Sequence, residues 1–213
     1  MESLSRHTDY GRQALAESHL LADPIAQLQA WLMEAEQHPI YEPNAFVLST
    51  VDATGHPTSR TVLLKSVDEQ GLFFATNFES RKGRAIDSTG RVSAVFGWYP
   101  MHRQVLIDGL AVRAADAESD AYFASRPRGS QLGAWASAQS QPAADRKVIE
   151  AAYAAVEAEY EGREIPRPPF WGGYRIQPLR MEFWAGRTSR LHDRIEFARD
   201  SIGAPWQVRR LQP

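Results

Sequence analysis

The densest group of side chains with chemical potential lies near the end of the chain, in WAGRTSRLHDR from Trp184 to Arg194. His192 has no other histidine at a chelating spacing, and the chain has no H-E-x-x-H pattern, so a metal site is not indicated. If SRLHDR is extended, Arg190, His192 and Arg194 share one face and Asp193 points the other way. Because like charges on one face repel each other, this spacing predicts bound anions.

A second basic group lies in TNFESRKGR, residues 76–84. Ser80 is expected to cap a helix whose first turn carries Arg81 and Lys82, with Arg84 close behind. Cations at a helix N-terminus oppose the helix dipole, which is unfavourable unless an anion binds there. Free N–H groups, a hydroxyl and an arginine fork suit a phosphate monoester. The alternative is a basic turn exposed to solvent.

A third stretch, SRTVLLK at residues 59–65, reads as a strand. Alternation puts Thr61, Leu63 and Lys65 on one face and Arg60, Val62 and Leu64 on the other. Each face then carries one cation for a ligand, or the two charges lie in solvent at the strand ends.

The stretch YFASRPRGSQLGAWASAQS, residues 122–140, has the Arg, Ser, Gln and Trp content of a loop that wraps a polar ligand. A purely structural loop is the alternative. Ser130 lacks the glycine spacing of a nucleophile elbow, so we expect it to donate a hydrogen bond rather than to attack a substrate.

Composition excludes several classes of function. The 213 residues carry 24 Lys plus Arg against 26 Asp plus Glu, so no overall field would hold the protein on nucleic acid or a membrane. The chain has no G-x-G-x-x-G, no P-loop motif and no cysteine. No segment approaches the roughly 18 apolar residues of a membrane span. We therefore expect a cytoplasmic enzyme or binding protein for one or two phosphorylated small molecules.

The elements that must position these groups begin with a polar segment, residues 1–22, which predicts a flexible arm before a single domain at residues 23–213. Asp23 and Pro24 start an amphipathic helix that ends before Pro39. From Asn44 onward, short β-rich runs separated by turn residues predict a meander, interrupted by a helix near Ser80.

The second half of the chain mixes helices and strands. Asp116 is expected to cap a helix that stops before Pro127, and Pro142 to open a longer one. The runs GGYRIQP, RMEFWAG and WQVRRLQP predict two or three closing strands. Six or more antiparallel strands with peripheral helices predict a closed barrel of the mostly β or α+β class.

Taken together, RTVLLK, TNFESRKG, RQVLIDG, YFASRPRGSQLGAWASAQS, WGGYRIQP and EFWAGRTSRLHDR closely resemble the pyridoxine/pyridoxamine 5′-phosphate oxidase family, from about Asp23 to the terminal RLQP. The resemblance implies an antiparallel split β-barrel homodimer that binds FMN at the subunit interface. It implies oxidation of pyridoxine or pyridoxamine 5′-phosphate to pyridoxal 5′-phosphate, with hydride transfer from the substrate C4′ to flavin N5 and reduction of O2 to H2O2.

The resemblance also assigns the site residues. Those that match FMN contacts are Arg60, Thr61, Val62, Leu63, Leu64, Lys65, Ala75, Thr76, Arg81, Lys82, Gln104, Gln139, Ser140, Trp184 and Arg194. Those that match substrate contacts are Lys65, Tyr122, Arg126 and Ser130 around the phosphate, with Tyr10, Arg190, Leu191 and His192 elsewhere. Arg190 and His192 match the catalytic pair over the substrate ring, where His192 could also accept the released proton.

Some positions depart from the family pattern. The N-terminal arm usually offers an Arg and a Tyr three residues apart; Tyr10 fits, but His7 holds the Arg position, with Arg6 adjacent. Glu42 replaces a common Asp, and Ala75 a larger residue. The alternatives are a related FMN oxidase of phenazine biosynthesis and a non-catalytic flavin- or pyridoxal-phosphate-binding protein on the same fold.

Overall fold

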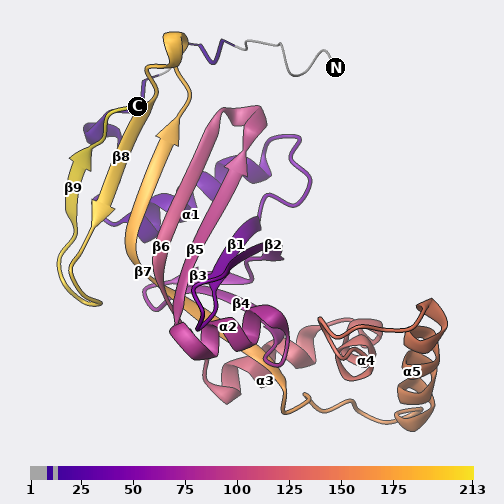
Figure 1. Cartoon of the computed structure of the whole chain (residues 1–213). Coiled ribbons are helices and arrows are strands. Elements are labelled where there is room, and N and C mark those ends of the chain that lie inside the picture. The colour runs from indigo at the N-terminus through magenta and orange to yellow at the C-terminus, as the bar shows by residue number, and fades with distance from the viewer. Residues whose placement is uncertain (1–8, 12–13) are drawn as a thin grey trace.

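The structure is a computed structural model that describes residues 9–11 and 14–213 (Figure 1). These residues form one antiparallel sheet in the order β2-β1-β5-β6-β7-β4-β3, with β8 paired to β7 and β9. The strands are β1 (Ala45–Val51), β2 (Pro57–Leu63), β3 (Ser66–Asp68), β4 (Gly71–Asn77), β5 (Arg91–Trp98), β6 (Arg103–Arg113), β7 (Trp171–Ala185), β8 (Asp193–Ala198) and β9 (Gln207–Arg210). No ladder joins β2 to β3 within this described sheet, so it curls into a half-barrel and the expected closed barrel is wrong.

Strand β7 is the spine of the sheet and runs without interruption where two separate strands were expected. It pairs with β4 near its start, with β6 along most of its length and with β8 near its end. The strand continues through Pro178 because the register of β6 shifts between Asp108 and Gly109, and Gly109 lies directly opposite that proline. A Cβ on Gly109 would lie 2.3 Å from the Gln177 carbonyl oxygen, so glycine permits this bulge.

The helices among the described residues are peripheral: α1 (Pro24–Glu36), α2 (Arg81–Thr89), α3 (Asp116–Ser125), α4 (Arg128–Ala136) and α5 (Arg146–Glu159), with short 3-10 turns η2 (Glu17–His19), η3 (Tyr99–Met101) and η4 (Thr188–Arg190). Helix α1 has the expected cap, since the Asp23 carboxylate accepts the Ile25 N–H at 3.0 Å. Its Trp31 packs edge-on against Phe183 of the core at 5.1 Å between ring centroids.

Three expectations for the second half of the chain are wrong in detail. Ala115 is the cap of α3, and Asp116 is its first residue. Helix α5 is opened by Asp145, whose carboxylate accepts the Val148 N–H, rather than by Pro142. The expected loop at residues 122–140 contains α4, because apolar side chains at helical spacing, such as Leu132, reach a second core cluster.

That second cluster lies beyond one end of the sheet, where Figure 1 shows α3, α4 and α5 projecting from the half-barrel. It is built from Phe123, Leu132, Ala134, Ile165 and Trp171, all buried. The Trp135 indole donates to the Pro166 carbonyl at 2.7 Å, which ties α4 to the segment leading into β7. The cluster therefore fixes α4 relative to the start of β7.

The N-terminal segment contacts the sheet within its described part. Leu15 is 9% exposed, and its N–H donates to the Asp193 carboxylate at 2.9 Å. The division into an arm at residues 1–22 and a single domain at residues 23–213 stays a prediction. His7 and Arg6 lie outside the described residues.

Candidate active site

The first cavity, of about 450 Å³, lies where β2 and β4 meet the α3–α4 region. It brings together eleven residues expected in the site: Thr61, Val62, Leu63, Lys65, Ala75, Thr76, Lys82, Tyr122, Arg126, Ser130 and Gln139. Thr61, Leu63 and Lys65, which strand alternation puts on one face, all line this cavity, but so does Val62 from the expected opposite face, and β2 itself ends at Leu63. Asn77, Pro127 and Trp171 also line this cavity and were missed.

Lys82 lies at the N-terminus of α2, as expected from the Ser80 cap, whose hydroxyl accepts the Gly83 N–H at 3.2 Å. Its ammonium donates to Thr76 Oγ1 at 2.9 Å and to Gln139 Oε1 at 2.8 Å. No carboxylate pairs with it among residues 9–11 and 14–213. Burial, reinforced by the charge of Arg60, lowers the pKa of Lys82 to about 8.

Two more cations, Arg60 and Arg81, lie near Lys82. Arg60 donates to Thr50 Oγ1 at 2.9 Å and to the Leu48 carbonyl at 3.2 Å on the neighbouring strand. Burial, together with the charge of Arg81, lowers the pKa of Arg60. The Arg81 N–H donates to Ser140 Oγ at 3.2 Å. Three mutually repelling cations gathered at one helix N-terminus are suited to an anion.

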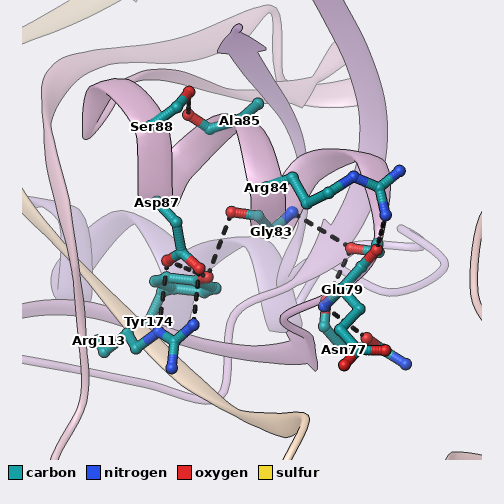
Figure 2. A network of polar contacts seen from close by, with 10 residues as sticks. Asn77, Glu79, Gly83, Arg84, Ala85, Asp87, Ser88, Arg113 and Tyr174 are labelled. Atoms are coloured by element: carbon teal, nitrogen blue, oxygen red, sulfur yellow. Dashed lines mark hydrogen bonds and ion pairs between the residues drawn. The ribbon is translucent and has the colours of Figure 1, made fainter. Parts of the chain in front are cut away.

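Polar contacts tie helix α2 to the neighbouring residues, as Figure 2 shows. Asp87 accepts from the Tyr174 hydroxyl at 2.8 Å and from the Arg113 guanidinium at 2.6 Å. Burial alone would raise the pKa of Asp87, but the bonds from Arg113 and Tyr174 outweigh it and lower that pKa. At the other end of the helix, Arg84 donates to the Glu79 carbonyl. These contacts fix the N-terminus that carries Arg81 and Lys82.

Arg126 also lines the first cavity. Its guanidinium lies 4.4 Å from the Trp171 ring centroid, and its Nη1 is buried with no hydrogen-bond partner among the described residues. Burial lowers the pKa of Arg126. By contrast, Arg167 and Arg175 outside the cavity are each held by two carboxylates. A buried N–H donor without a partner is costly, so the Arg126 guanidinium is suited to binding an anion.

The second cavity, of about 480 Å³, brings together Tyr10, Gln104, Trp184, Arg190 and His192 from the expected site. Tyr99, His102 and Arg103 also line it and were missed. Gln104 and Trp184 face each other across β6 and β7. The two cavities have no lining residue in common, so the described chain alone does not bring Arg190 and His192 to Arg126.

The segment before β8 is not extended, contrary to the expectation for SRLHDR. Ser189 and Arg190 have φ of 57° and 61° within and at the end of η4, and the strand begins only at Asp193. Nor is Arg194 an unpaired cation, since it forms a bidentate pair with Glu182 at 2.7 and 2.8 Å. Among the described residues, unpaired cations that favour a bound anion therefore line the first cavity, and the expected row of Arg190, His192 and Arg194 on one face does not form.

His192 is held in one tautomer when neutral. The Arg187 N–H donates to its Nδ1 at 3.0 Å, which leaves the neutral ring's proton on Nε2. Burial, with the charge of Arg190, lowers its pKa. The neutral ring is therefore arranged to donate a hydrogen bond from Nε2, and proton uptake at Nδ1 would first break the bond from Arg187.

The remaining expected residues lie outside both cavities. Leu64 is 6% exposed and belongs to the core, with its backbone N–H and C=O bonded to Asn44. Leu191 is 68% exposed beside the second cavity. No helix among the described residues is long and apolar enough to cross a membrane, and no cluster of metal-ligating side chains occurs among them.

Similar solved structures identify the class of fold to which the sheet belongs. A pyridoxamine 5′-phosphate oxidase-related, FMN-binding protein from Nostoc punctiforme superposes with a TM-score of 0.68 at 17% identity, over 90% of this chain and 98% of the other. The expected split β-barrel is confirmed. PhzG from Burkholderia lata, solved with tetrahydrophenazine-1-carboxylic acid, superposes with a TM-score of 0.88 at 35% identity, over 95% of this chain and 100% of that one.

Sequence comparison identifies the family. Residues 32–160 match the model of pyridoxamine 5′-phosphate oxidase, and residues 171–213 match the C-terminal dimerisation region of pyridoxine 5′-phosphate oxidase. The pyridoxine/pyridoxamine 5′-phosphate oxidase of Rubrobacter xylanophilus is 53% identical over 96% of this chain and 94% of its own length. That of Cupriavidus metallidurans is 49% identical over 96% of each chain. The chain belongs to the pyridoxamine 5′-phosphate oxidase family of FMN-dependent oxidoreductases, and its dimerisation region indicates a homodimer.

Proposed function

We propose that this chain oxidises pyridoxine or pyridoxamine 5′-phosphate to pyridoxal 5′-phosphate, reducing O2 to H2O2, in the cytoplasm. The observation that carries the proposal is the first cavity, which is lined by two cations without carboxylate partners among the described residues, Lys82 and Arg126. Two anion subsites suit two phosphorylated ligands, a cofactor and a substrate.

In this proposal FMN, when bound, would supply the two-electron redox chemistry between the substrate C4′ and O2. Lys82, Arg60 and Arg81 hold its phosphate at the N-terminus of α2. Arg126, Lys65, Tyr122 and Ser130 hold the substrate phosphate, with the Lys65 ammonium 5.8 Å from the Tyr122 ring centroid. The stacked position of Arg126 over Trp171 fixes its fork for that contact.

Arg190 and His192 orient the substrate ring. His192 donates from Nε2 to an oxygen on the ring, since its Nδ1 is already engaged by Arg187. Proton acceptance by this histidine, an expectation from the sequence, is disfavoured by that bond. Because the two cavities share no residue, we propose that the second cavity of one subunit faces the first cavity of its partner.

An aerobic assay of the purified protein with FMN and pyridoxamine 5′-phosphate tests the activity. The expected result is steady formation of pyridoxal 5′-phosphate, followed by absorbance, with an equal amount of H2O2. A protein that binds FMN but forms no product would refute the proposed substrate. The second candidate, a phenazine-type oxidase, is favoured by the similarity to PhzG. Turnover of a tetrahydrophenazine carboxylic acid in preference to pyridoxamine 5′-phosphate would support it.

Subunit complementation tests the shared site. Arg126→Ala and Arg190→Ala are each expected to be inactive, because one loses the phosphate contact and the other the ring contact. If the site is shared, random exchange of subunits restores about a quarter of wild-type activity, since half of the dimers carry one intact site. Mixed dimers without activity would show that each site is built within one chain.

A further inference from the structure

Tyr10 packs against three rings at the edge of the second cavity. Its ring centroid lies 4.7 Å from that of His102, 5.6 Å from that of His192 and 6.0 Å from that of Trp184, each with an edge-on geometry. His102 is the nearest of the three. It belongs to neither the cations nor the ring-orienting pair described above, and the function so far gives it no role.

The backbone at Gly186 allows Tyr10 to pack closely against it. A Cβ at position 186 would lie 2.8 Å from Tyr10 Cβ and 3.1 Å from His102 Cβ, so only glycine permits this approach. The Gly186 N–H donates to the His102 carbonyl at 2.8 Å, which couples the end of β7 to the turn after η3. His102 closes that turn with φ of 52°, in the left-handed region.

A backbone hydrogen bond also connects the residue after Tyr10 to the η4 turn, which carries Arg190. The Thr188 N–H donates to the Gly11 carbonyl at 3.1 Å, and Thr188 begins the η4 turn that ends at Arg190. The ring of Tyr10 also packs edge-on against His192, whose Nδ1 accepts the Arg187 N–H. Displacing Tyr10 would therefore remove one ring contact of His192 and loosen the start of η4, whereas the bond from Arg187 to His192 would remain.

We propose that His102 is a positioning residue which, together with Gly186, holds Tyr10 against His192 and thereby fixes the wall of the second cavity that orients the substrate ring. The part of this inference that concerns substrate rests on the proposed function. His102 is not among the residues that we propose to contact FMN, so the affinity for FMN is expected to be unaffected by loss of its imidazole.

Hydrogen exchange at the Thr188 amide, followed by mass spectrometry of the holoenzyme, tests the contact without any substrate. His102→Ala is expected to raise the exchange rate about three- to tenfold, the effect of losing one aromatic edge contact. Gly186→Ala is expected to do the same by displacing Tyr10, and His102→Phe to restore protection because it keeps a ring. His56→Ala, in the exposed turn between β1 and β2, is the matched control.

Steady-state kinetics then separate this inference from the proposed function. His102→Ala is expected to raise KM for pyridoxamine 5′-phosphate about three- to tenfold more than His56→Ala does, with FMN binding unchanged. Unchanged Thr188 exchange in His102→Ala would overturn the positioning role. Faster exchange in a protein with no oxidase activity on this substrate would support the role of His102 in holding Tyr10 and refute the proposed substrate instead.

Discussion

If Lys82 binds the FMN phosphate as we propose, its ammonium links the affinity for FMN to pH. With its pKa lowered to about 8 in the free protein, Lys82 is charged below that pH and neutral above it. A phosphate monoester is already a dianion above about pH 6 to 7. Binding of the dianion favours the charged amine, so above about pH 8 the protein must take up a proton to bind FMN, and the affinity falls as the pH rises.

The size of this effect follows from the pKa. If the bound state keeps Lys82 charged, Kd scales with the inverse of the protonated fraction in the free protein, which falls about tenfold between pH 7 and pH 9. Lys82→Met removes the titrating group. Its Kd is expected to be raised about ten- to a hundredfold at pH 7, the loss of one charge-assisted hydrogen bond, and to vary little with pH.

Quenching of FMN fluorescence on titration with apoprotein measures these Kd values at both pH values. Lys147→Met, on the exposed face of α5, is the matched control and is expected to keep the tenfold dependence. The chain has three lysines, Lys65, Lys82 and Lys147, so ¹³C-labelled lysine NMR can follow the Lys82 pKa directly. A wild-type Kd that is equal at pH 7 and pH 9, or an equal slope in Lys82→Met, would refute the reasoning.

Three further substitutions separate binding, chemistry and stability. Arg81→Ala is expected to lose FMN on gel filtration, and full retention would remove Arg81 from the phosphate site. Arg190→Ala is expected to retain FMN while turnover falls sharply; unchanged turnover would remove Arg190 from the mechanism. Glu196, 1% exposed, pairs with Arg180 at 2.5 Å and Arg209 at 2.6 Å. Burial alone would raise the pKa of Glu196, but these pairs outweigh it and lower the pKa below its ordinary value of 4.5. The stabilisation is thus complete above about pH 4.5 and is lost as pH falls through the folded-state pKa. Urea unfolding should show Glu196→Gln losing stability at pH 7 and losing less near pH 3; an equal loss at both would contradict the pairing.

The parts of the site that depend on local chemistry could be predicted from the sequence. Ser80 caps α2 because a hydroxyl before a helix satisfies free N–H groups, whatever surrounds it. Strand alternation put Thr61, Leu63 and Lys65 on one face, and all three line the first cavity, together with Val62 from the other expected face. The polar content of residues 122–140 indicated a ligand-binding segment, but only the family resemblance pointed to Gln139 itself, which accepts a hydrogen bond from Lys82.

Features that depend on distant contacts could not be predicted in this way. Arg194 was expected to be an unpaired cation, but Glu182 lies beside it only because β7 and β8 pair in one register. The left-handed backbone at Arg190 is set by the tertiary environment of η4, since arginine has no local preference for positive φ. His102 could not be predicted as part of the site because its contact with Tyr10 joins residues 92 positions apart in the chain.

Anaerobic mixing of the FMN-loaded protein with pyridoxamine 5′-phosphate tests the central claim most directly, because it isolates the transfer of electrons from substrate to cofactor. The account predicts loss of the oxidised flavin absorbance in a single turnover, slowed when the C4′ hydrogens are replaced by deuterium. Flavin that stays oxidised with saturating substrate would contradict it and leave the chain as a member of the family with a different substrate.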